Sequence, residues 1–149
     1  MTIEEEIKQK AFQSEYQKTT INIMFTSGWL YNMNASKLKK HGITPEQFNV
    51  LRILRGSYPK PLMLSSITSR MIDRASNATR LVEKLRLKDL VKREVCTQSR
   101  RQVDIIITTK GLALLTEIDN DTNGLETTLN AITKTEAKEL NRILDKLRK

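Results

Sequence analysis

Few side chains in this sequence could support acid–base, nucleophilic or metal chemistry. One cysteine, Cys96, and one histidine, His41, cannot supply the three or four soft ligands of an ordinary zinc site. No nucleophile elbow, phosphate-binding loop or metalloprotease motif occurs. We therefore expect no enzyme: no catalytic residues, no metal and no cofactor. Cys96 would be a redox sensor only if Arg93, Arg100 or Arg101 stabilised its thiolate, and a passive thiol is the alternative.

Basic side chains are concentrated in one segment of the chain. The 149 residues include 26 Lys and Arg against 17 Asp and Glu, a net charge of +9. Residues 70–101 hold ten basic and four acidic side chains, so they carry +6 of that charge. A solvated helix face usually mixes both signs, so this excess favours a polyanionic partner. The basic residues are Arg70, Arg74, Arg80, Lys84, Arg86, Lys88, Lys92, Arg93, Arg100 and Arg101.

Within this segment, residues 76–88 have the pattern of an amphipathic helix. Four apolar residues fall on one narrow arc at 100° per residue, and they are Ala78, Leu81, Val82 and Leu85. The opposite arc carries Ser76, Asn77, Arg80, Glu83 and Lys84. Small hydrogen-bonding side chains and arginine at a helix start can reach base edges in a major groove. Every surface helix has a polar face, so this feature is weak evidence by itself.

A β-hairpin is expected directly after that helix. Val91, Arg93 and Val95 alternate with Lys92 and Glu94, which is the period of a strand. In the same way Val103, Ile105 and Ile107 alternate with Asp104 and Ile106. The connecting segment, Thr97–Arg101, is polar and doubly basic. This composition suits a wing that places arginine in a minor groove, with a solvated turn as the alternative.

The elements before this segment are expected to be helical. A long helix is predicted from about Glu4 to Lys40, ended by Gly42. The segment Thr44–Gln47 reads as a capping box with proline at the first helical position, and Gly56–Pro59 ends the helix that it starts. A third helix is predicted over about Ser65–Met71.

Two further helices are predicted at the C-terminal end. One is capped by Thr108 and runs toward Ile132, and the next is opened by a capping box at Thr133–Glu136. The last helix carries an i, i+3, i+4, i+7 apolar stripe that needs a partner surface. Because symmetric dimers are the commonest oligomers, we expect a homodimer held by this stripe and the long first helix. The stripe is Leu140, Ile143, Leu144 and Leu147.

Length and hydropathy predict a single compact unit in the cytoplasm. The longest aliphatic run is Ile105–Ile107, far short of the roughly 18 apolar residues of a membrane span, so no membrane partner is expected. The start, Met1–Glu6, contains three carboxylates where a secretory signal would be basic and then apolar.

The order of these elements and their motifs resembles the multiple antibiotic resistance regulator (MarR) family of bacterial winged helix-turn-helix repressors. The resemblance covers nearly the whole chain, and it is most specific where recognition helix and wing occur together. The matching segments are Ile43–Phe48 with Leu51 and Leu54, Thr79–Leu85, Leu90–Arg93, Arg100–Arg101 and Ile107–Gly111. Two residues depart from the family pattern: Asp89 replaces a glycine, and Ser99 replaces an aspartate that clamps the wing arginine.

The resemblance implies a mainly α fold with a small β-hairpin wing. Residues 43–111 would form the winged helix-turn-helix lobe, and residues 1–42 and 112–149 would form dimerisation helices. The homodimer would bind double-stranded DNA at an inverted-repeat operator, as a transcriptional regulator and a repressor released by a small ligand. The DNA-binding residues would be Ser76, Asn77, Thr79, Arg80 and Lys84 on the recognition helix, Ser99, Arg100 and Arg101 on the wing, and Arg70 and Arg74 at phosphates.

A ligand cleft is a further implication of the resemblance. Family members bind small, often aromatic or phenolic, ligands between the dimerisation helices and the DNA-binding lobe. Trp29, Tyr31 and Met33 would line such a cleft, with packing in the core as the alternative.

Two other functions remain open at this point. A protein-interaction module can use the same fold, since fold does not dictate function, but it would be expected to have a neutral or acidic recognition face. An RNA-binding module would be expected to show clustered exposed aromatic side chains for base stacking, and only seven Phe, Trp and Tyr residues occur.

Overall fold

The computed structural model describes residues 1–96, 98–99, 101–121 and 129–149. The helices are α1 (Ile3–Glu6), α2 (Glu15–Lys39), α3 (Pro45–Ser57), α4 (Leu64–Arg70), α5 (Ala78–Leu87), α6 (Thr109–Asp119) and α8 (Lys134–Leu147), with a 3₁₀ turn, η1, at Leu129–Ala131. The strands are β1 (Leu62–Met63), β2 (Val91–Val95) and β3 (Val103–Ile107). The expected fold, mainly helical with a small β wing, is confirmed.

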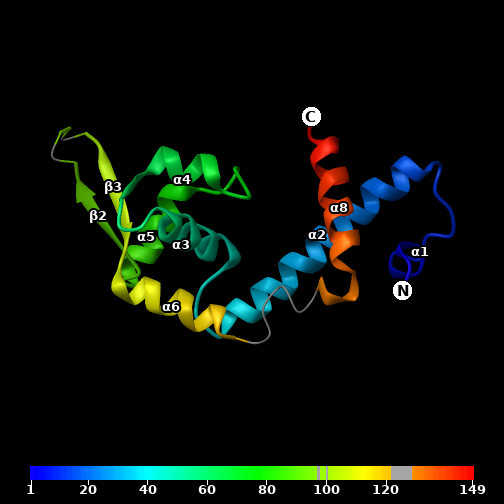
Figure 1. Cartoon of the computed structure of the whole chain (residues 1–149), viewed down its shortest axis with the longest axis horizontal. Coiled ribbons are helices and arrows are strands. Elements are labelled where there is room, and N and C mark those ends of the chain that lie inside the picture. Colours follow the sequence, from blue (N-terminus) through cyan, green and yellow to red (C-terminus); the bar gives the residue numbers. More distant parts are fainter. Residues whose placement is uncertain (97, 100, 122–128) are drawn as a thin grey trace.

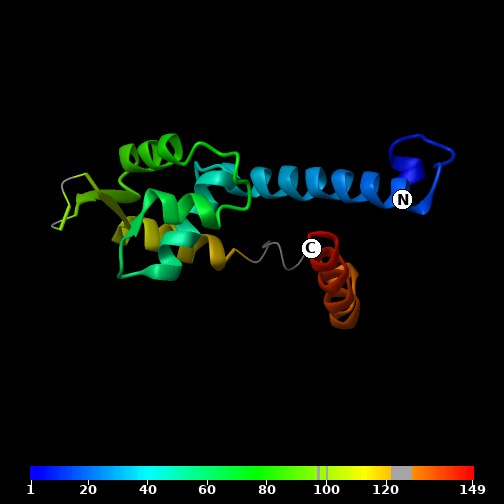
Figure 2. The ribbon, with the colours of Figure 1, turned by 90° about the horizontal axis from the view of Figure 1, so that it is seen from above.

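The molecule is elongated, with a lobe at one end and a long helix leading away from it. The lobe contains α3, α4, α5, α6 and the sheet, and α2 extends from it toward α1 (Figure 1). The β2–β3 hairpin lies at one end of the molecule, and α1 lies at the other (Figure 1). In the second view α8 stands clear of α2, although the two helices cross in the first (Figure 2).

One apolar core holds the lobe together. Its fully buried side chains include Leu51 of α3, Ile67 of α4, Leu85 of α5 and Ile105 of β3. Leu115 of α6 is also fully buried in this cluster. Burial of this kind stabilises a fold by about 25 cal/mol per Å² of apolar surface removed from water. The core therefore fixes α5 and the sheet relative to each other, and these are the two elements of the candidate site.

The sheet has three antiparallel strands in the order β1-β3-β2. The hairpin strands pair over their full length, from Val91 opposite Ile107 to Val95 opposite Val103. The third strand was not expected: Leu62 pairs with Ile105 just before α4 begins. Two residues are too few to show a period in sequence, so only the tertiary pairing reveals this strand.

The expected single helix from Glu4 to Lys40 is wrong at its start. The chain instead forms the short α1, a connecting segment and then α2. Thr2 and Glu5 form a capping box, and the side chain of Ser14 accepts a hydrogen bond from the N–H of Gln17 at 3.1 Å. The Ser14 cap competes with a continuous helix, because it fixes an extended backbone at a position inside the predicted helix. The predicted end is confirmed, since α2 stops at Lys39 and Gly42 has a φ of +71°.

The helix after the wing is also shorter than expected. It is capped by Thr108 as predicted, but it ends at Asp119 and does not continue to Ile132. Asp119, Asn120 and Asp121 follow one another at this end, and these residue types have low helix propensity. Acidic side chains also interact unfavourably with the negative end of the helix dipole.

The turn between α5 and β2 is closed although Asp89 replaces glycine. Asp89 has a φ of +58°, the left-handed conformation that a Schellman motif requires. The N–H of Leu90 donates to Leu85 O at 3.0 Å, and that of Asp89 donates to Arg86 O at 2.9 Å. Thr108 Oγ1 also donates to Asp89 O at 2.7 Å. Asp89 therefore adopts the left-handed conformation in place of the glycine of the family pattern.

The remaining predicted elements agree closely with the structure. The capping box at Thr44 and Gln47 opens α3, and a second one at Thr133 and Glu136 opens α8. The helix expected near Ser65–Met71 is α4. Among the described residues, no helix is both long enough and apolar enough to cross a membrane.

Candidate nucleic-acid interface

The helix α5 presents a polar face because its other face is anchored in the core. Ala78, Val82 and Leu85 are buried, as the predicted apolar arc requires. Thr79, Arg80 and Lys84 are exposed. In the part of the chain that the structure describes, neither Arg80 nor Lys84 has an ion-pair partner. Two cations on this helix are therefore available to an external anion.

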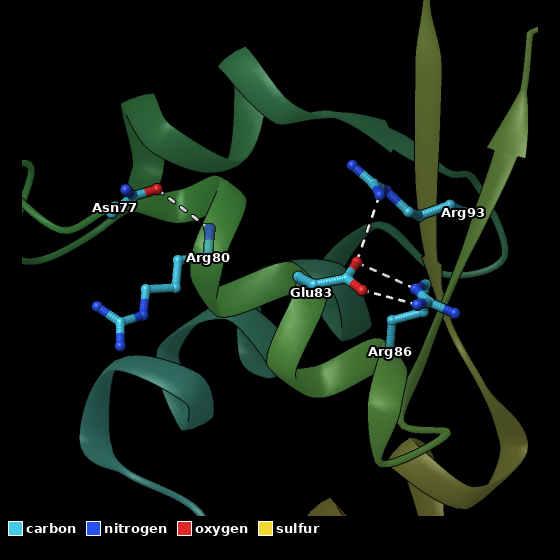
Figure 3. Close-up of polar contacts among 5 residues, drawn as sticks. All are labelled: Asn77, Arg80, Glu83, Arg86 and Arg93. Atoms are coloured by element: carbon cyan, nitrogen blue, oxygen red, sulfur yellow. Dashed lines mark hydrogen bonds and ion pairs between the residues drawn. The ribbon is translucent and has the colours of Figure 1, made fainter.

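The expected helix start at Ser76 is wrong by two residues. Asn77 is the N-cap of α5, and its side-chain oxygen accepts a hydrogen bond from Arg80 N at 3.1 Å (Figure 3). Ser76 precedes the cap, and its N–H donates to Asp73 O at 3.2 Å. An asparagine immediately before an apolar arc is an N-cap signal, which the periodicity argument alone did not use. The side-chain oxygen of Asn77 is thus engaged within the protein.

Glu83 forms a contact between α5 and the wing that sequence reasoning missed. Its carboxylate accepts two hydrogen bonds from Arg86, at 3.0 Å from Nε and 2.6 Å from Nη2. It also accepts one from Arg93 Nη1 of β2 at 3.3 Å (Figure 3). The hydrogen bond from Arg86 is the largest cause of a lowered Glu83 pKa. The i, i+3 spacing of Glu83 and Arg86 signals their pairing, whereas the contact with Arg93 depends on how β2 packs against α5.

The wing is a short hairpin with an exposed basic tip. Cys96 N donates to Gln102 O at 3.0 Å, and Gln102 N donates to Ser99 O at 3.2 Å, so the backbone closes on itself. Arg101 and Ser99 are exposed, and Arg101 has no ion-pair partner among the described residues. Arg100, also assigned to the wing, lies outside the described residues.

The two arginines assigned to phosphate contacts both lie on the surface. Arg70, at the end of α4, donates from Nη1 to Ser57 Oγ at 3.2 Å. Arg74 is exposed between α4 and α5. Both residues precede the N-terminal end of α5, whose backbone N–H groups attract anions.

A cavity of about 400 Å³ lies between α2 and the lobe. Its lining includes Tyr31 of α2, Phe48 and Arg52 of α3, and Met71 beyond α4. Of the residues proposed for a ligand cleft, Tyr31 lines this cavity, whereas Trp29 borders a smaller one of about 230 Å³ beside α1. Met33 lines neither of these two cavities. Trp29 and Tyr31 are each nearly half exposed, so packing in the core of this chain is not their role.

Tyr31 also links α2 to the start of α3. Its hydroxyl donates to Glu46 Oε1 at 2.7 Å. This hydrogen bond, together with burial and the charge of Glu46, raises the pKa of Tyr31 above its ordinary value. The link lies at the cavity, because both residues line it.

The apolar stripe of α8 is exposed in the single chain. Leu140 is 48% exposed, Ile143 is 42% exposed and Leu147 is 59% exposed, while Leu144 is partly buried. On α2, Met24 is 70% exposed.

Among the described residues, no group of three or more His, Cys, Asp or Glu side chains is arranged to hold a metal ion.

The curated proteins to which the chain is similar are transcriptional regulators. No protein-family model matches the chain. It is 33% identical over 84 residues to the HTH-type transcriptional regulator MhqR of Bacillus subtilis, a match that spans 56% of this chain and 57% of that protein. It is 28% identical over 109 residues to the HTH-type transcriptional regulator MgrA of Staphylococcus aureus, over 73% of this chain and 72% of MgrA.

Solved structures agree over most of the chain. A putative MarR-like transcription regulator from Bacillus cereus has a TM-score of 0.78 at 20% identity, over 90% of this chain and 96% of that one. MepR of Staphylococcus aureus in complex with DNA has a TM-score of 0.77 at 24% identity, over 92% and 97%. A MarR transcription factor from Planctomyces limnophilus has a TM-score of 0.69 at 26% identity, over 91% and 98%.

Proposed function

Because the chain is a winged helix-turn-helix protein of the MarR family, we propose that it is a sequence-specific, double-stranded DNA-binding transcriptional regulator. The observation that carries this proposal is the polar face of α5, where Arg80 and Lys84 are exposed without ion-pair partners in the described chain. The relatives are named as regulators, which favours a binding function over catalysis. MepR, which has the same fold, was solved with DNA.

In this proposal α5 enters the major groove and the wing reaches an adjacent minor groove. Arginine donates two hydrogen bonds to the acceptors of a guanine, so Arg80 suits base reading. Threonine can hydrogen-bond to a base edge or contact the methyl group of thymine, so Thr79 suits it as well. Arg101 on the wing would enter a minor groove, where A·T-rich DNA has a strong negative potential. Arg70 and Arg74, with Ser76 beside them, would contact phosphates, which position a protein without reading sequence.

We assign the remaining helices to a homodimer. The exposed stripe of α8 and the exposed apolar residues of α2 support this assignment, since each leaves apolar surface without a partner in one chain. Residues 1–42 and 112–149 would supply the interface, and residues 43–111 would form the DNA-binding lobe. Two lobes related by a two-fold axis would read an inverted repeat, with half-site centres about one helical turn, ~10 base pairs, apart.

The cavity beside α2 supports regulation by a small ligand. Its walls come from α2 on one side and from α3 and the α4–α5 segment on the other, so an occupant would contact both the dimerisation helix and the lobe. Phe48 and Met71 offer apolar contact, and the guanidinium of Arg52 offers hydrogen-bond donors. We propose that an aromatic ligand bound here changes the spacing of the two lobes and releases a repressor from its operator.

A binding-site selection from random duplex DNA tests the function. The protein should select an inverted repeat, and its affinity should fall with salt at about −0.9 in log K against log salt for each phosphate contact. Selection of no repeat, together with a flat salt response, would leave a protein-interaction module as the better explanation. Single-stranded RNA of matched length is the control, because a duplex-reading helix gives it no preference.

A further inference from the structure

Glu83 lies between two arginines that would otherwise add to the basic surface of the lobe. Arg86 shares α5 with it, and Arg93 reaches it from β2 (Figure 3). The side chains are neither buried nor fully open: Glu83 is 39% exposed, Arg86 is 44% exposed and Arg93 is 43% exposed. All three can therefore meet an external charge.

The position of this group follows from the two elements that it connects. If α5 enters a major groove and the wing enters the next minor groove, one sugar–phosphate backbone of the DNA separates the two grooves. That backbone must pass between α5 and the β2–β3 hairpin. Glu83, Arg86 and Arg93 bridge α5 and β2, so they face the path of the phosphates.

Glu83, Arg86 and Arg93 together carry a net charge of +1 when Glu83 is ionised. Arg86 lowers the Glu83 pKa, so the carboxylate is charged at neutral pH. A phosphate that approaches either arginine must compete with this carboxylate for the same N–H groups and is also repelled by it. By contrast, Arg80 and Lys84 have no acidic partner in the described chain. Arg80 and Lys84 are thus available to phosphate, whereas Arg86 and Arg93 are held by Glu83.

We propose that Glu83 determines specificity by holding Arg86 and Arg93 away from the phosphate backbone, so that non-specific DNA binding stays weak. This inference rests on the proposed function and extends it. Charge-driven affinity is the same for every sequence, so a regulator that limits it gains in the ratio of specific to non-specific binding. Glu83 is a specificity-determining residue here without any contact to a base.

The test is Glu83→Gln, measured on a duplex of mixed sequence that lacks the selected operator. Glutamine has the same shape but no charge, so Arg86 and Arg93 become free to bind phosphate. We expect the slope of log K against log salt to steepen by about 0.9 for each arginine released. Over the range from 50 to 200 mM salt, each released arginine then adds about a 3.5-fold further loss of affinity. We also expect Glu83→Gln to bind this duplex more tightly than the wild type at low salt.

A matched control separates this effect from a general change in charge. Glu139 on α8 binds Arg142 with nearly the same geometry, 2.9 Å from Nε and 2.6 Å from Nη2. Glu139→Gln changes the net charge of the chain by the same amount, outside the DNA-binding lobe. We expect its salt slope to remain that of the wild type. Equal steepening in both variants would overturn the proposal.

A second variant removes an arginine in two backgrounds. Arg93→Gln should change the slope little in the wild type, because Glu83 already holds Arg93. In the Glu83→Gln background it should remove about 0.9 of the added slope. If Glu83 only holds the wing in position, a different result is expected. Glu83→Gln and Arg93→Gln would then each weaken operator binding and leave the slope of log K against log salt unchanged. That result would also overturn the proposal.

Failure of this inference is distinguishable from failure of the proposed function. Wild-type protein that binds no duplex refutes the proposed function and, with it, this inference. Wild-type protein that binds an operator with a normal salt slope, together with a Glu83→Gln slope equal to it, refutes the role of Glu83 alone.

Discussion

The side-chain oxygen of Asn77 accepts a hydrogen bond from the backbone N–H of Arg80 at 3.1 Å, and this contact starts α5. The guanidinium of Arg80 has no ion-pair partner in the described chain. Two residues that the sequence assigns to one task therefore differ in the structure. Asn77 determines where the helix begins, and only its amide NH₂ is available to DNA. The entire guanidinium of Arg80 is available to DNA.

Arg80→Ala should relax base preference without changing the fold. Loss of a base contact should cost about 1 to 3 kcal/mol of discrimination at particular base pairs, in both halves of the repeat. Asn77→Ala should instead lower the free energy of unfolding by about 1 kcal/mol, because a helix cap is lost. Site selection measures the first effect, and urea unfolding measures the second.

Two further variants make this contrast sharper. Asn77→Ser keeps a capping oxygen, so its stability should stay close to that of the wild type. Arg101→Ala should weaken binding at all sites, with the largest loss at A·T-rich steps. If Arg80→Ala keeps the wild-type preference while Arg101→Ala alters it at particular base pairs, base reading does not belong to α5.

Local signals in the sequence predicted most of the elements, and tertiary packing decided the rest. Capping boxes gave the starts of α3 and α8, and the buried arc gave α5, because these features lie within a few residues of one another. The link from Glu83 to Arg93 crosses ten residues and two elements. No spacing rule indicates it, since it exists only because the core packs α5 against β2.

Gly111 should tolerate no larger residue. A Cβ at this position would overlap the carbonyl oxygen of Leu90 and lie 2.7 Å from Cγ1 of Ile107. Both neighbours belong to the sheet side of the core, so Gly111→Ala should destabilise the lobe by about 1 to 3 kcal/mol. Urea unfolding at fixed protein concentration measures this change.

Gly56 provides the control for that substitution. It lies in the last turn of α3, and a Cβ there would meet nothing within 4 Å. Gly56→Ala should be neutral or should stabilise the chain by up to about 1 kcal/mol, because alanine has less backbone freedom to lose. Equal stability of the two alanine variants would contradict the close packing at Gly111.

Tyr31 should ionise at a higher pH than an unfolded tyrosine. The hydrogen bond to Glu46 is the largest cause of its raised pKa, and it favours the protonated phenol. The folded chain therefore holds this proton more tightly than the unfolded chain does. Its contribution to stability is complete below the unfolded pKa of about 10 and is lost as pH rises through the folded pKa. Tyrosinate absorbance during a pH titration, with Tyr31→Phe to assign the signal, measures it.

Glu46→Gln tests the cause of that shift. Glutamine keeps an acceptor oxygen but removes the negative charge, so the pKa of Tyr31 should fall toward its ordinary value. An unchanged titration of Tyr31 in this variant would mean that the charge of Glu46 does not control the proton. Absorbance of the Tyr31→Phe, Glu46→Gln double variant gives the baseline for the other tyrosines.

Leu140→Glu should convert the dimer to monomer. Leu140 is 48% exposed in the single chain, and burying a leucine against a partner contributes about 1.5 to 3 kcal/mol, whereas a buried unpaired carboxylate costs more than that. Sedimentation at micromolar concentration should show dimers for the wild type and monomers for the variant.

Lys138→Gln is the control for the dimer, because it makes the same change of charge on the opposite side of α8. It should remain dimeric and keep wild-type affinity for the operator. Leu140→Glu should lose affinity for the complete inverted repeat, since one lobe alone reads one half-site and the second half-site no longer adds to binding. Its weaker affinity for an isolated half-site should stay close to that of the wild type, because the α5 face is untouched. A wild-type protein that sediments only as monomer, or a dimeric Leu140→Glu variant, would show that the α8 stripe is not the interface.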